Sequence, residues 1–321
     1  MSKAIVIPFY RYHPRIGEYY KVYFETLLNG LKIWGDEFDK LYLIDQEWGF
    51  TQNDRDKLQN IKPDSEILVS PVTGHHWEQF KWAIPQIKED TILFLDNDVV
   101  IWKKGVIDNW FKRAENSGIV SAFDGSGGLK NIVHENFKSM KIMDATRMGS
   151  YYFILHKDIF DKIPDFDFSP ITYPIGTYIK ELDYTTQEGD WSDSFGLFTI
   201  KLLALNPTIN VIIDDRSSIS LSKDGIIKTT EEPLQLGYYH VRNGNLPVYT
   251  LASKASPEHY QDYTRTLQIT PFTEFTRLFA WFDILTNHKW GEIDSVLMDL
   301  GIGINEWKSY VEEVKKYHGY D

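Results

Sequence analysis

The sequence contains no cysteine among its 321 residues, which excludes disulfide bonds, thiolate metal sites and cysteine nucleophiles. Any metal or catalytic site must therefore use Asp, Glu, His or hydroxyl groups. Basic residues are also scarce, with 34 Lys and Arg against 46 Asp and Glu, and the net charge is -12. Because this charge repels nucleic acid and anionic lipid, we expect no nucleic-acid partner.

Long apolar runs are missing as well. No stretch approaches the roughly 18 residues that a membrane span needs. The apolar run that follows Met1 is too short for the core of a signal peptide. These absences predict a cytoplasmic protein with no integral membrane segment. Hydrophobic residues still make up 42% of the chain, enough for the core of one large domain or two modest ones.

The first hundred residues alternate between short apolar strands and segments with apolar residues at helical spacing. Such alternation predicts βαβ units and a Rossmann-like half. We expect the first strand to end at a proline, with a polar and aromatic loop after it. The expected strands are 4–8, 41–44, 66–70 and 92–95, and the expected helices are 17–35, 53–59 and 78–87.

The pattern becomes less regular after the fourth expected strand, although strands and helices still alternate. From Pro257 the chain changes character and carries mostly helical patterns, which predicts a helical C-terminal appendage. A flexible loop is expected at 124–129. The expected strands are 118–123, 149–155, 182–185, 211–214 and 237–242, and the expected helices are 106–116, 190–205, 258–267, 272–285 and 305–317.

The strongest chemical signal is the stretch Leu-Phe-Leu-Asp-Asn-Asp-Val at 93–99. The apolar run before it lacks polar alternation, which predicts a strand buried on both faces. Asp96 and Asp98 then emerge at the carboxyl end of that strand, where open α/β sheets bind ligands. Two such carboxylates can hold a hard divalent cation against a diphosphate. The alternative is a pair of solvated turn carboxylates.

With this motif the chain resembles the metal-dependent glycosyltransferases of the GT-A fold, whose DXD motif ends a central strand after a nucleotide-binding half. The resemblance implies a Rossmann-like α/β/α sandwich around a central mixed, mostly parallel sheet. It divides residues 1–256 into a nucleotide-sugar-binding half (1–102) and an acceptor-binding half (103–256), with 257–321 as the helical extension. It implies transfer of a sugar from a nucleoside diphosphate sugar, with a UDP-sugar expected, to a carbohydrate or other hydroxyl acceptor.

The resemblance also assigns donor-binding roles. The loop after the first strand, with Pro8, Tyr10 and Arg11, resembles the segment that meets the nucleotide base and ribose. Asp45 resembles the carboxylate that reads a base edge, although an Asp at a strand end is as often an ordinary turn residue. Lys81 is the candidate to meet a phosphate, with a solvated helix lysine as the alternative.

A second acidic segment, Glu-Gly-Asp-Trp-Ser-Asp at 188–193, precedes an expected apolar helix. Inverting enzymes of this fold place a base at a helix start near this position, and displacement at the anomeric carbon needs a carboxylate that accepts the acceptor's proton. Asp193 is the first candidate, followed by Asp190 and then Glu188. Either Asp could instead be only a helix N-cap. The chain lacks the Glu-Asp pair common in this motif.

The segment Arg-Met-Gly-Ser-Tyr-Tyr-Phe at 147–153 resembles one that lines the acceptor side in the same family. Gly149 would allow a close backbone approach, and Tyr151 or Trp191 could stack on a sugar face. For both aromatic residues, packing in the core is the alternative.

His240 follows an aromatic strand and precedes Val-Arg-Asn-Gly, a context that resembles the third metal ligand of several GT-A families. Arg242 would then hold phosphate oxygens. Imidazole completes an Asp-Asp site more readily for Mn²⁺ than for Mg²⁺, and either ion is expected as the cofactor. A histidine packed in the core is the alternative.

Two other classes fit the same residues. The stretch at 93–99 also resembles the haloacid-dehalogenase-like phosphatases, in which the first Asp, here Asp96, is the nucleophile. That motif normally lies on the first strand of its domain, whereas three strand-helix units precede it here. The third possibility is a catalytically silent nucleotide-sugar-binding module, which would bind donor without hydrolysis or transfer.

Overall fold

The structure, a computed structural model, divides into two compact units. The first unit comprises residues 1–10, 36–96 and 103–237, and the second comprises 11–35, 97–102 and 238–321. The expected loop at 124–129 and the expected helices after Pro257 lie outside the residues that the structure describes. The described residues are 1–10, 21–46, 49–72, 75–97, 99–101, 103–123, 148–180, 184–188, 190–192, 194–205, 208–214, 217–222, 225–230 and 238–240.

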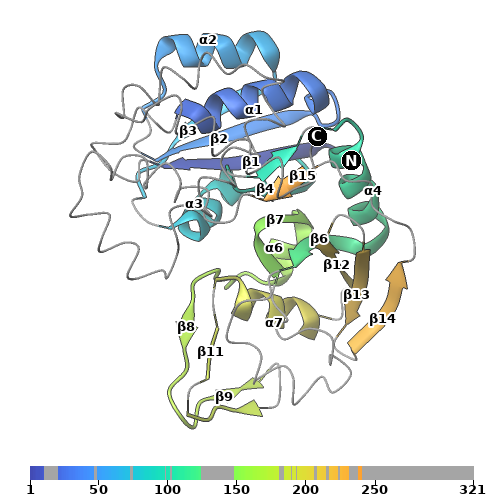
Figure 1. Cartoon of the computed structure of the whole chain (residues 1–321). Coiled ribbons are helices and arrows are strands. Elements are labelled where there is room, and N and C mark those ends of the chain that lie inside the picture. Colours follow the sequence, from blue (N-terminus) through green and yellow to red (C-terminus); the bar gives the residue numbers. More distant parts are fainter. Residues whose placement is uncertain are drawn as a thin grey trace, which may run out of the picture. The chain divides into compact units, whose positions relative to one another are not determined.

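Nine strands of the first unit form one mixed sheet (Figure 1). Their spatial order is β14 (Gly225–Thr230), β13 (Ser217–Ser222), β12 (Thr208–Asp214), β6 (Gly118–Phe123), β7 (Met148–His156), β4 (Thr91–Leu95), β1 (Lys3–Tyr10), β2 (Lys40–Gln46) and β3 (Ser65–Val69). β1 to β4 pair in parallel, as expected. β7 runs antiparallel to both of its neighbours, β4 and β6. The α/β class expected from the sequence is thereby confirmed.

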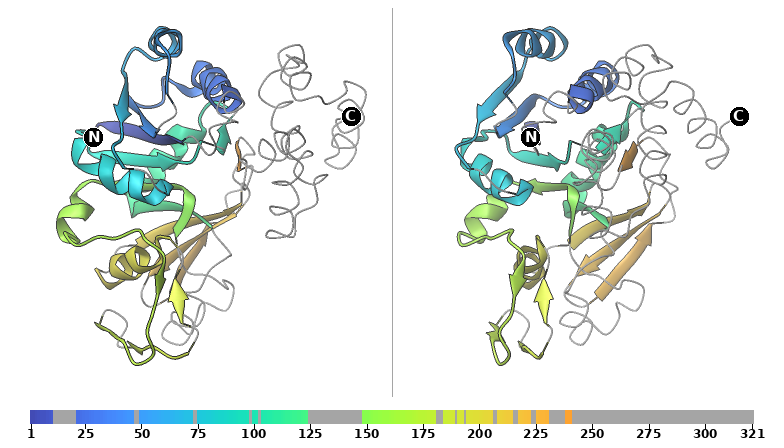
Figure 2. Two further views of the ribbon diagram at one scale, coloured as in Figure 1. Left: turned by 90° about the vertical axis from the view of Figure 1, so that its left-hand side faces the viewer. Right: turned by 60° about the vertical axis from the view of Figure 1, so that its left-hand side comes forward.

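Beyond β6 the sheet continues through β12, which pairs in parallel with β6, and through the antiparallel strands β13 and β14. Figure 2 shows these brown and gold strands side by side in both views. β13 and β14 were not predicted from the sequence. β13 does carry a signal, the alternation of serine with Ile219 and Leu221, which is a strand period of two.

The first strand extends further than its proline suggested. β1 runs through Pro8 to Tyr10, and Pro8 is paired with Ile44 of β2. The expectation that the proline ends the strand is wrong because only one side of β1 is paired there. The β1–β4 ladder ends at Val6 and Phe94, so Pro8 lies where a missing N–H is tolerated.

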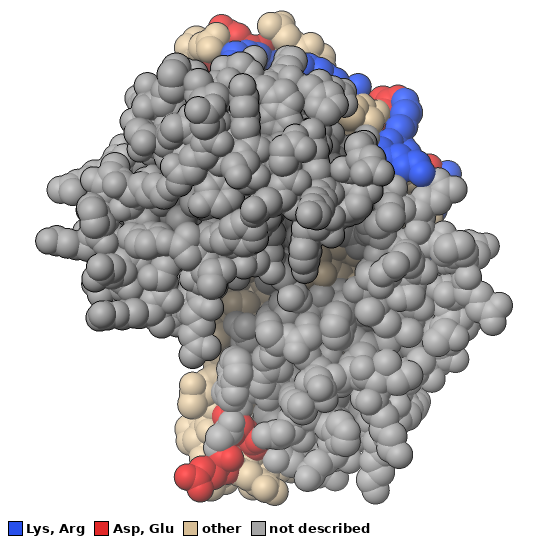
Figure 3. Space-filling view, viewed as in Figure 1, with Lys and Arg blue, Asp and Glu red and all other residues tan. Residues whose placement is uncertain are grey.

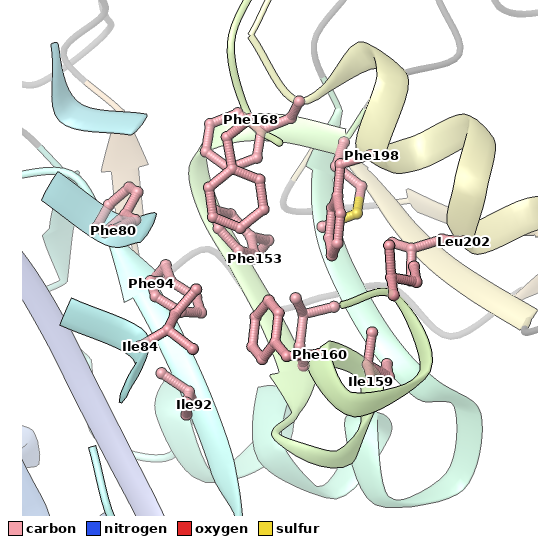
Figure 4. Close-up of a cluster of buried hydrophobic side chains, with 14 of the residues drawn as sticks. Phe80, Ile84, Ile92, Phe94, Phe153, Ile159, Phe160, Phe168, Phe198 and Leu202 are labelled. Carbon is pink, nitrogen blue, oxygen red and sulfur yellow. The ribbon is translucent and has the colours of Figure 1, made fainter. Parts of the chain in front are cut away.

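Helices cover both faces of this sheet within the first unit. One face carries α3 (His76–Ala83), α6 (Asp158–Lys162) and α7 (Gly196–Ala204), whose apolar side chains meet Phe94 and Phe153 in one buried cluster (Figure 4). The opposite face carries α4 (Val106–Ser117), where Trp110 stacks on Tyr152 with 4.2 Å between ring centroids. Alternate residues of β7 therefore belong to two different layers.

Two helices of the first unit begin or end away from their predicted residues. The helix expected at 78–87 is α3 followed by a 3-10 turn at Ile84–Gln86, because Pro85 cannot continue the α-helical hydrogen bonds. The helix expected from residue 190 begins only at Gly196, after the short strand β11 (Trp191–Ser192). The helix expected at 53–59 is α2 (Gln52–Ile61), which begins with a capping box formed by Thr51 and Asp54.

Short strand pairs connect the segments beside α7. β11 pairs with β8 (Ile171–Thr172), and β9 (Tyr178–Ile179) pairs with β10 (Tyr184–Thr185), both antiparallel. The strand expected at 182–185 is described only for its last two residues. The β8–β11 pair places residues 190–192 beside residues 171–173.

The second unit contains α1 (Lys21–Trp34), β5 (Val99–Ile101) and β15 (Tyr238–His240) among its described residues. β5 and β15 pair antiparallel. The Trp34 indole N–H donates to the Ile101 carbonyl over 2.9 Å, which ties the end of α1 to β5. Residues 238–240, the last that the structure describes, therefore lie beside the segment that follows Asp98 in the sequence.

Charged side chains of both signs lie together on the described surface. In Figure 3, basic and acidic side chains are neighbours near the top of the view, and ion pairs such as Lys40–Glu66 at 3.5 Å fit this pattern. Among the described helices, none has both the length and the apolar character needed to cross a bilayer.

Gly149 provides the first prediction. A Cβ added at this position would lie 2.8 Å from both the Cβ and the carbonyl oxygen of Ala122 on β6. Replacement of Gly149 by alanine should lower the free energy of unfolding by about 1–3 kcal/mol, because the paired strands must move apart. Urea denaturation measures this loss.

The matched control is the double variant Ala122→Gly with Gly149→Ala. It should recover only part of the stability, because the contact with the Ala122 carbonyl oxygen remains. A single variant as stable as the wild type would contradict the close approach of β6 and β7.

Candidate active site

The carboxyl ends of β1 and β4 form the centre of the candidate site. The chain builds β1, β2 and β3 outward in one direction, and then places β4 on the other side of β1. Such a reversal of strand order is the point at which open α/β sheets bind ligands. Pro8 and Asp96 each lie two residues beyond the last β1–β4 pair. The sequence-based expectation that Asp96 follows a strand buried on both faces is confirmed, because every residue of β4 is buried.

The backbone of Asp96 is anchored to β7. Its amide donates to the Tyr151 carbonyl over 2.9 Å, and Leu95 before it pairs with Tyr152. The Asp96 side chain is partly exposed. Tyr151, expected on the acceptor side, is therefore bound through its backbone to the residue after β4. Asp98 lies outside the described residues.

His240 lies at a defined register position in the second unit. In the β5–β15 pair it is opposite Val99, the residue that directly follows Asp98 in sequence. Its backbone is described and its side chain is not. Strand pairing thus brings a residue that is distant in sequence beside the segment that follows Asp96-Asn97-Asp98.

A group of three or more metal-binding side chains is not found among the described residues. Asp98 and the imidazole of His240 lie outside the described part of the chain. Two carboxylates and one imidazole are nevertheless a donor set that suits Mn²⁺, and the carboxylates alone suit Mg²⁺. The residue types therefore fit a divalent cation.

Asp45 organises the turn after β2. It is 5% exposed, its Oδ1 accepts from the Gly49 amide over 3.0 Å, and its Oδ2 accepts from the Phe50 amide over 3.3 Å. The Phe50 ring packs edge-on against Phe9 of β1, with 5.4 Å between centroids. These contacts are those expected if Asp45 is an ordinary turn residue. Contact of Asp45 with the edge of a nucleotide base stays a prediction.

Lys81 already has an ionic partner. Its Nζ lies 3.6 Å from Oδ1 of Asp167 and 6.0 Å from the centroid of the Phe166 ring. Asp167 also accepts hydrogen bonds from the Ser169 amide and hydroxyl, at 3.2 and 2.8 Å. A phosphate would have to compete with Asp167 for this lysine. Sequence analysis did not identify Asp167, which has no motif around it.

Asp190 is buried within a turn. It is 3% exposed, and its Oδ2 accepts from the Gln187 amide over 2.7 Å. Its carbonyl accepts from the Tyr173 amide over 3.2 Å. For Asp190 the N-cap alternative is wrong, because the N-cap residue of α7 is Phe195. Asp193 lies outside the described residues.

The remaining donor-side candidates are only partly visible. Tyr10 is described through its backbone, which pairs with Gln46 of β2. Arg11 and Arg242 lie outside the described residues. No role predicted for these three residues is tested by the fold.

Comparison with known proteins adds only distant structural similarity. No family model and no curated protein sequence matches the chain. The crystal structure of Staphylococcus aureus TarS residues 1–349 has a TM-score of 0.41 and 13% identity, covering 90% of this chain and 73% of that one. Glycosyltransferase GlyE of Streptococcus pneumoniae has a TM-score of 0.35 and 13% identity, covering 51% of this chain and 36% of that one.

A third similar structure is glucosyl-3-phosphoglycerate synthase from Mycobacterium tuberculosis, in complex with Mn²⁺, UDP and glucosyl-3-phosphoglycerate. It has a TM-score of 0.34 and 12% identity, over 53% of this chain and 60% of that one. This chain therefore spans less than two thirds of the latter two proteins. Similarity at these levels concerns the course of the chain and assigns no activity to it.

The second prediction concerns the acid stability that Asp167 contributes. Burial alone would raise the pKa of Asp167, but the Ser169 hydrogen bonds and the Lys81 ammonium outweigh it and lower the pKa below its ordinary value. The ionised carboxylate therefore stabilises the fold above its unfolded-state pKa of about 3.9. That stabilisation is lost as the pH falls through the lowered folded-state pKa.

Asp167→Asn should thus be less stable than the wild type by roughly 1 kcal/mol at pH 7. The difference should narrow as the pH falls below 4. Urea midpoints across this range measure it, with Asp161→Asn, an exposed acid on α6, as the control for loss of one charge. A difference that does not change with pH would contradict the ionised role of Asp167.

Proposed function

We propose that the protein is a divalent-metal-dependent glycosyltransferase of the GT-A type. It would move a sugar from a nucleoside diphosphate sugar, with a UDP-sugar first, to an acceptor hydroxyl, with inversion. The observation that carries the proposal is the position of Asp96 directly after β4, at the point where the strand order reverses beside β1. A hexose is the expected sugar class.

The strand order supports transferase over phosphatase. Asp96 follows the fourth strand of a parallel β1–β4 set, whereas the phosphatase motif normally follows the first strand of its domain. The parallel strands before the acids end at the reversal of strand order, which is where open α/β sheets bind ligands. The phosphatase alternative has no equivalent use for this half of the sheet.

We propose that Asp96, Asp98 and His240 hold Mn²⁺ or Mg²⁺. The register of His240 opposite Val99 supports this set, because Val99 directly follows Asp98 in the sequence. When bound, the ion would neutralise charge that develops on the leaving diphosphate. Arg242 would add a guanidinium for the phosphate oxygens.

The donor would lie against the carboxyl end of β1, which contains Pro8 and Tyr10 and is followed in sequence by Arg11. Asp45 and Lys81 have contacts of their own in the described structure, so their donor roles rank below those of β1. Lys81 would reach a phosphate only by leaving Asp167. Asp45 would act mainly by fixing the turn that supports Phe9.

We propose Asp193 as the base that takes the proton from the acceptor hydroxyl. The base must be accessible to the acceptor, and Asp190 is buried with its carboxylate bonded to the Gln187 amide. That burial ranks Asp193 ahead of Asp190. This mechanism needs one carboxylate to accept the proton and none to act as a nucleophile. The acceptor would therefore displace the diphosphate in one step, with inversion at the anomeric carbon.

The third prediction tests the acids after β4. Asp96→Ala and Asp98→Ala should each reduce metal-dependent hydrolysis of a nucleoside diphosphate sugar by about a hundredfold or more, because the charge on the leaving diphosphate is no longer neutralised. Release of the nucleoside diphosphate, followed by chromatography, measures the rate.

The matched control is Asp90→Ala. Asp90 lies at the opposite end of β4, where it accepts from the Ser2 amide over 2.9 Å, so its loss should leave hydrolysis unchanged. Full activity in both Asp96→Ala and Asp98→Ala would overturn the proposal. Release of phosphate from a simple phosphoester that depends on Asp96 would instead identify the phosphatase.

The fourth prediction concerns ligand binding to the native protein. UDP with Mn²⁺ should raise the melting temperature more than the sum of the separate ligands, because the ion joins the diphosphate to the carboxylates. At a concentration of a hundred times Kd, the stabilisation is about 2.7 kcal/mol. EDTA should reverse it.

A screen of nucleoside diphosphates of different bases gives the comparison. A shift with the nucleotides and no turnover of any nucleotide sugar would indicate the silent binding module. The absence of a shift with every nucleotide, with and without metal, would contradict a nucleotide-sugar site altogether.

A further inference from the structure

Phe195 has a backbone conformation that phenylalanine rarely adopts. Its φ is 68° and its ψ is -2°, and among the described residues it is the only one other than glycine with a positive φ. Its side chain is fully buried. A left-handed residue with a Cβ is unfavourable, so the surrounding contacts must hold it there.

The ring of Phe195 lies between α3 and β7. It stacks on Phe168 at 4.7 Å and on His76 at 6.1 Å, and it packs against Phe153 at 4.8 Å and Phe80 at 6.4 Å between centroids. We call these five side chains the Phe195 cluster. Figure 4 shows the Phe80, Phe153 and Phe168 side chains converging in this part of the core. Aromatic contacts of this kind add to the stability from burial alone.

The backbone of Phe195 is held as well. Its amide donates to the Phe168 carbonyl over 2.9 Å, and its carbonyl accepts from the Thr199 amide and hydroxyl at 2.9 and 2.7 Å. The Thr199 hydroxyl in turn accepts from the Met148 amide over 3.0 Å, at the start of β7. Through Thr199, Phe195 is therefore linked to β7, the strand whose Tyr151 carbonyl accepts from the Asp96 amide.

The residues before Phe195 are those of the acidic segment. Trp191 and Ser192 pair with β8, and Phe195 bonds to Phe168, so the segment is fixed on both sides of position 193. α3 reaches the same place, because its Lys81 pairs with Asp167, next to Phe168. α3, the helix that precedes β4, therefore contacts the residues that fix the acidic segment.

We propose that Phe195 is a positioning residue that holds the acidic segment at a fixed place relative to α3 and β7. The left-handed backbone turns the chain from β11 into α7, and the buried ring keeps this turn in register with His76 and Phe80. This inference rests on the proposed transferase function. It predicts that the rate of the chemical step, and not donor binding, depends on the Phe195 ring.

The test compares Phe195→Leu with Phe160→Leu, the same substitution in the same buried core. Phe160 packs on Phe94, Phe166, Phe168 and Phe198, so it shares the ring partner Phe168 with Phe195, but it lies on α6 and not in the turn between β11 and α7. With the UDP-, GDP- or dTDP-sugar that the wild type hydrolyses fastest in Mn²⁺, Phe195→Leu should lower kcat about tenfold to a hundredfold. Its affinity for the nucleoside diphosphate should change by less than about twofold, and Phe160→Leu should leave both nearly unchanged.

Amide hydrogen exchange gives a readout that does not depend on the reaction. The amides of Asp190 and Phe195 should exchange at least about tenfold faster in Phe195→Leu than in Phe160→Leu, because their bonds to Gln187 and Phe168 open more often. If the wild type hydrolyses no nucleotide sugar, the proposed function fails while this readout still decides the role of Phe195.

Thr199→Val and Thr199→Ser form a second pair, should Phe195→Leu not fold. Valine removes the hydroxyl that bonds to the Phe195 carbonyl and the Met148 amide, and serine keeps it. The valine variant should show the same loss of kcat and faster exchange, and the serine variant should behave as the wild type. Equal exchange in Phe195→Leu and Phe160→Leu, or equal losses of kcat and nucleotide affinity, would overturn the inference.

Discussion

Complete burial of β4 is the constraint on which the described architecture depends. The strand has β1 on one side and β7 on the other, and its two faces contribute to different layers of the core. No ionised group fits inside such a strand, because an unpaired buried charge is strongly unfavourable. The carboxylates are therefore displaced to the strand ends, with Asp90 before it and Asp96 after it, and Asp96 falls where the strand order reverses.

Local patterns were sufficient for most of the sheet. The uninterrupted apolar run at 92–95 identified a doubly covered strand, and the alternation of strands and helices identified the parallel units before it. Where prediction failed, pairing partners decided the outcome. Pro8 remains in β1 because only β2 pairs with it there, and Pro85 divides the expected helix because it cannot donate to the preceding turn.

The candidate site was predictable only in part, because some of its residues are held by segments that are distant in the sequence. The position of Asp96 is set by β4, the strand directly before it, so this position could be predicted from the neighbouring residues in the sequence. Asp45 and Asp190 are engaged by backbone amides of turns, and no motif distinguishes such a carboxylate from one that meets a ligand. The left-handed Phe195 gave no signal at all, since its conformation is imposed by rings from α3, β7 and the segment around Phe168.

The pairing of β15 with β5 has a practical consequence for the design of shortened chains. Among the described strands, β5 has β15 as its sole partner, and β15 lies far along the sequence from it. A chain ended before residue 238 would keep the nine-stranded sheet whole and yet leave the backbone groups of Val99 to Ile101 without that partner. Cooperative melting of such a fragment would report on the sheet and not on β5, which would have lost its strand partner. The boundary for expression should accordingly be drawn beyond His240.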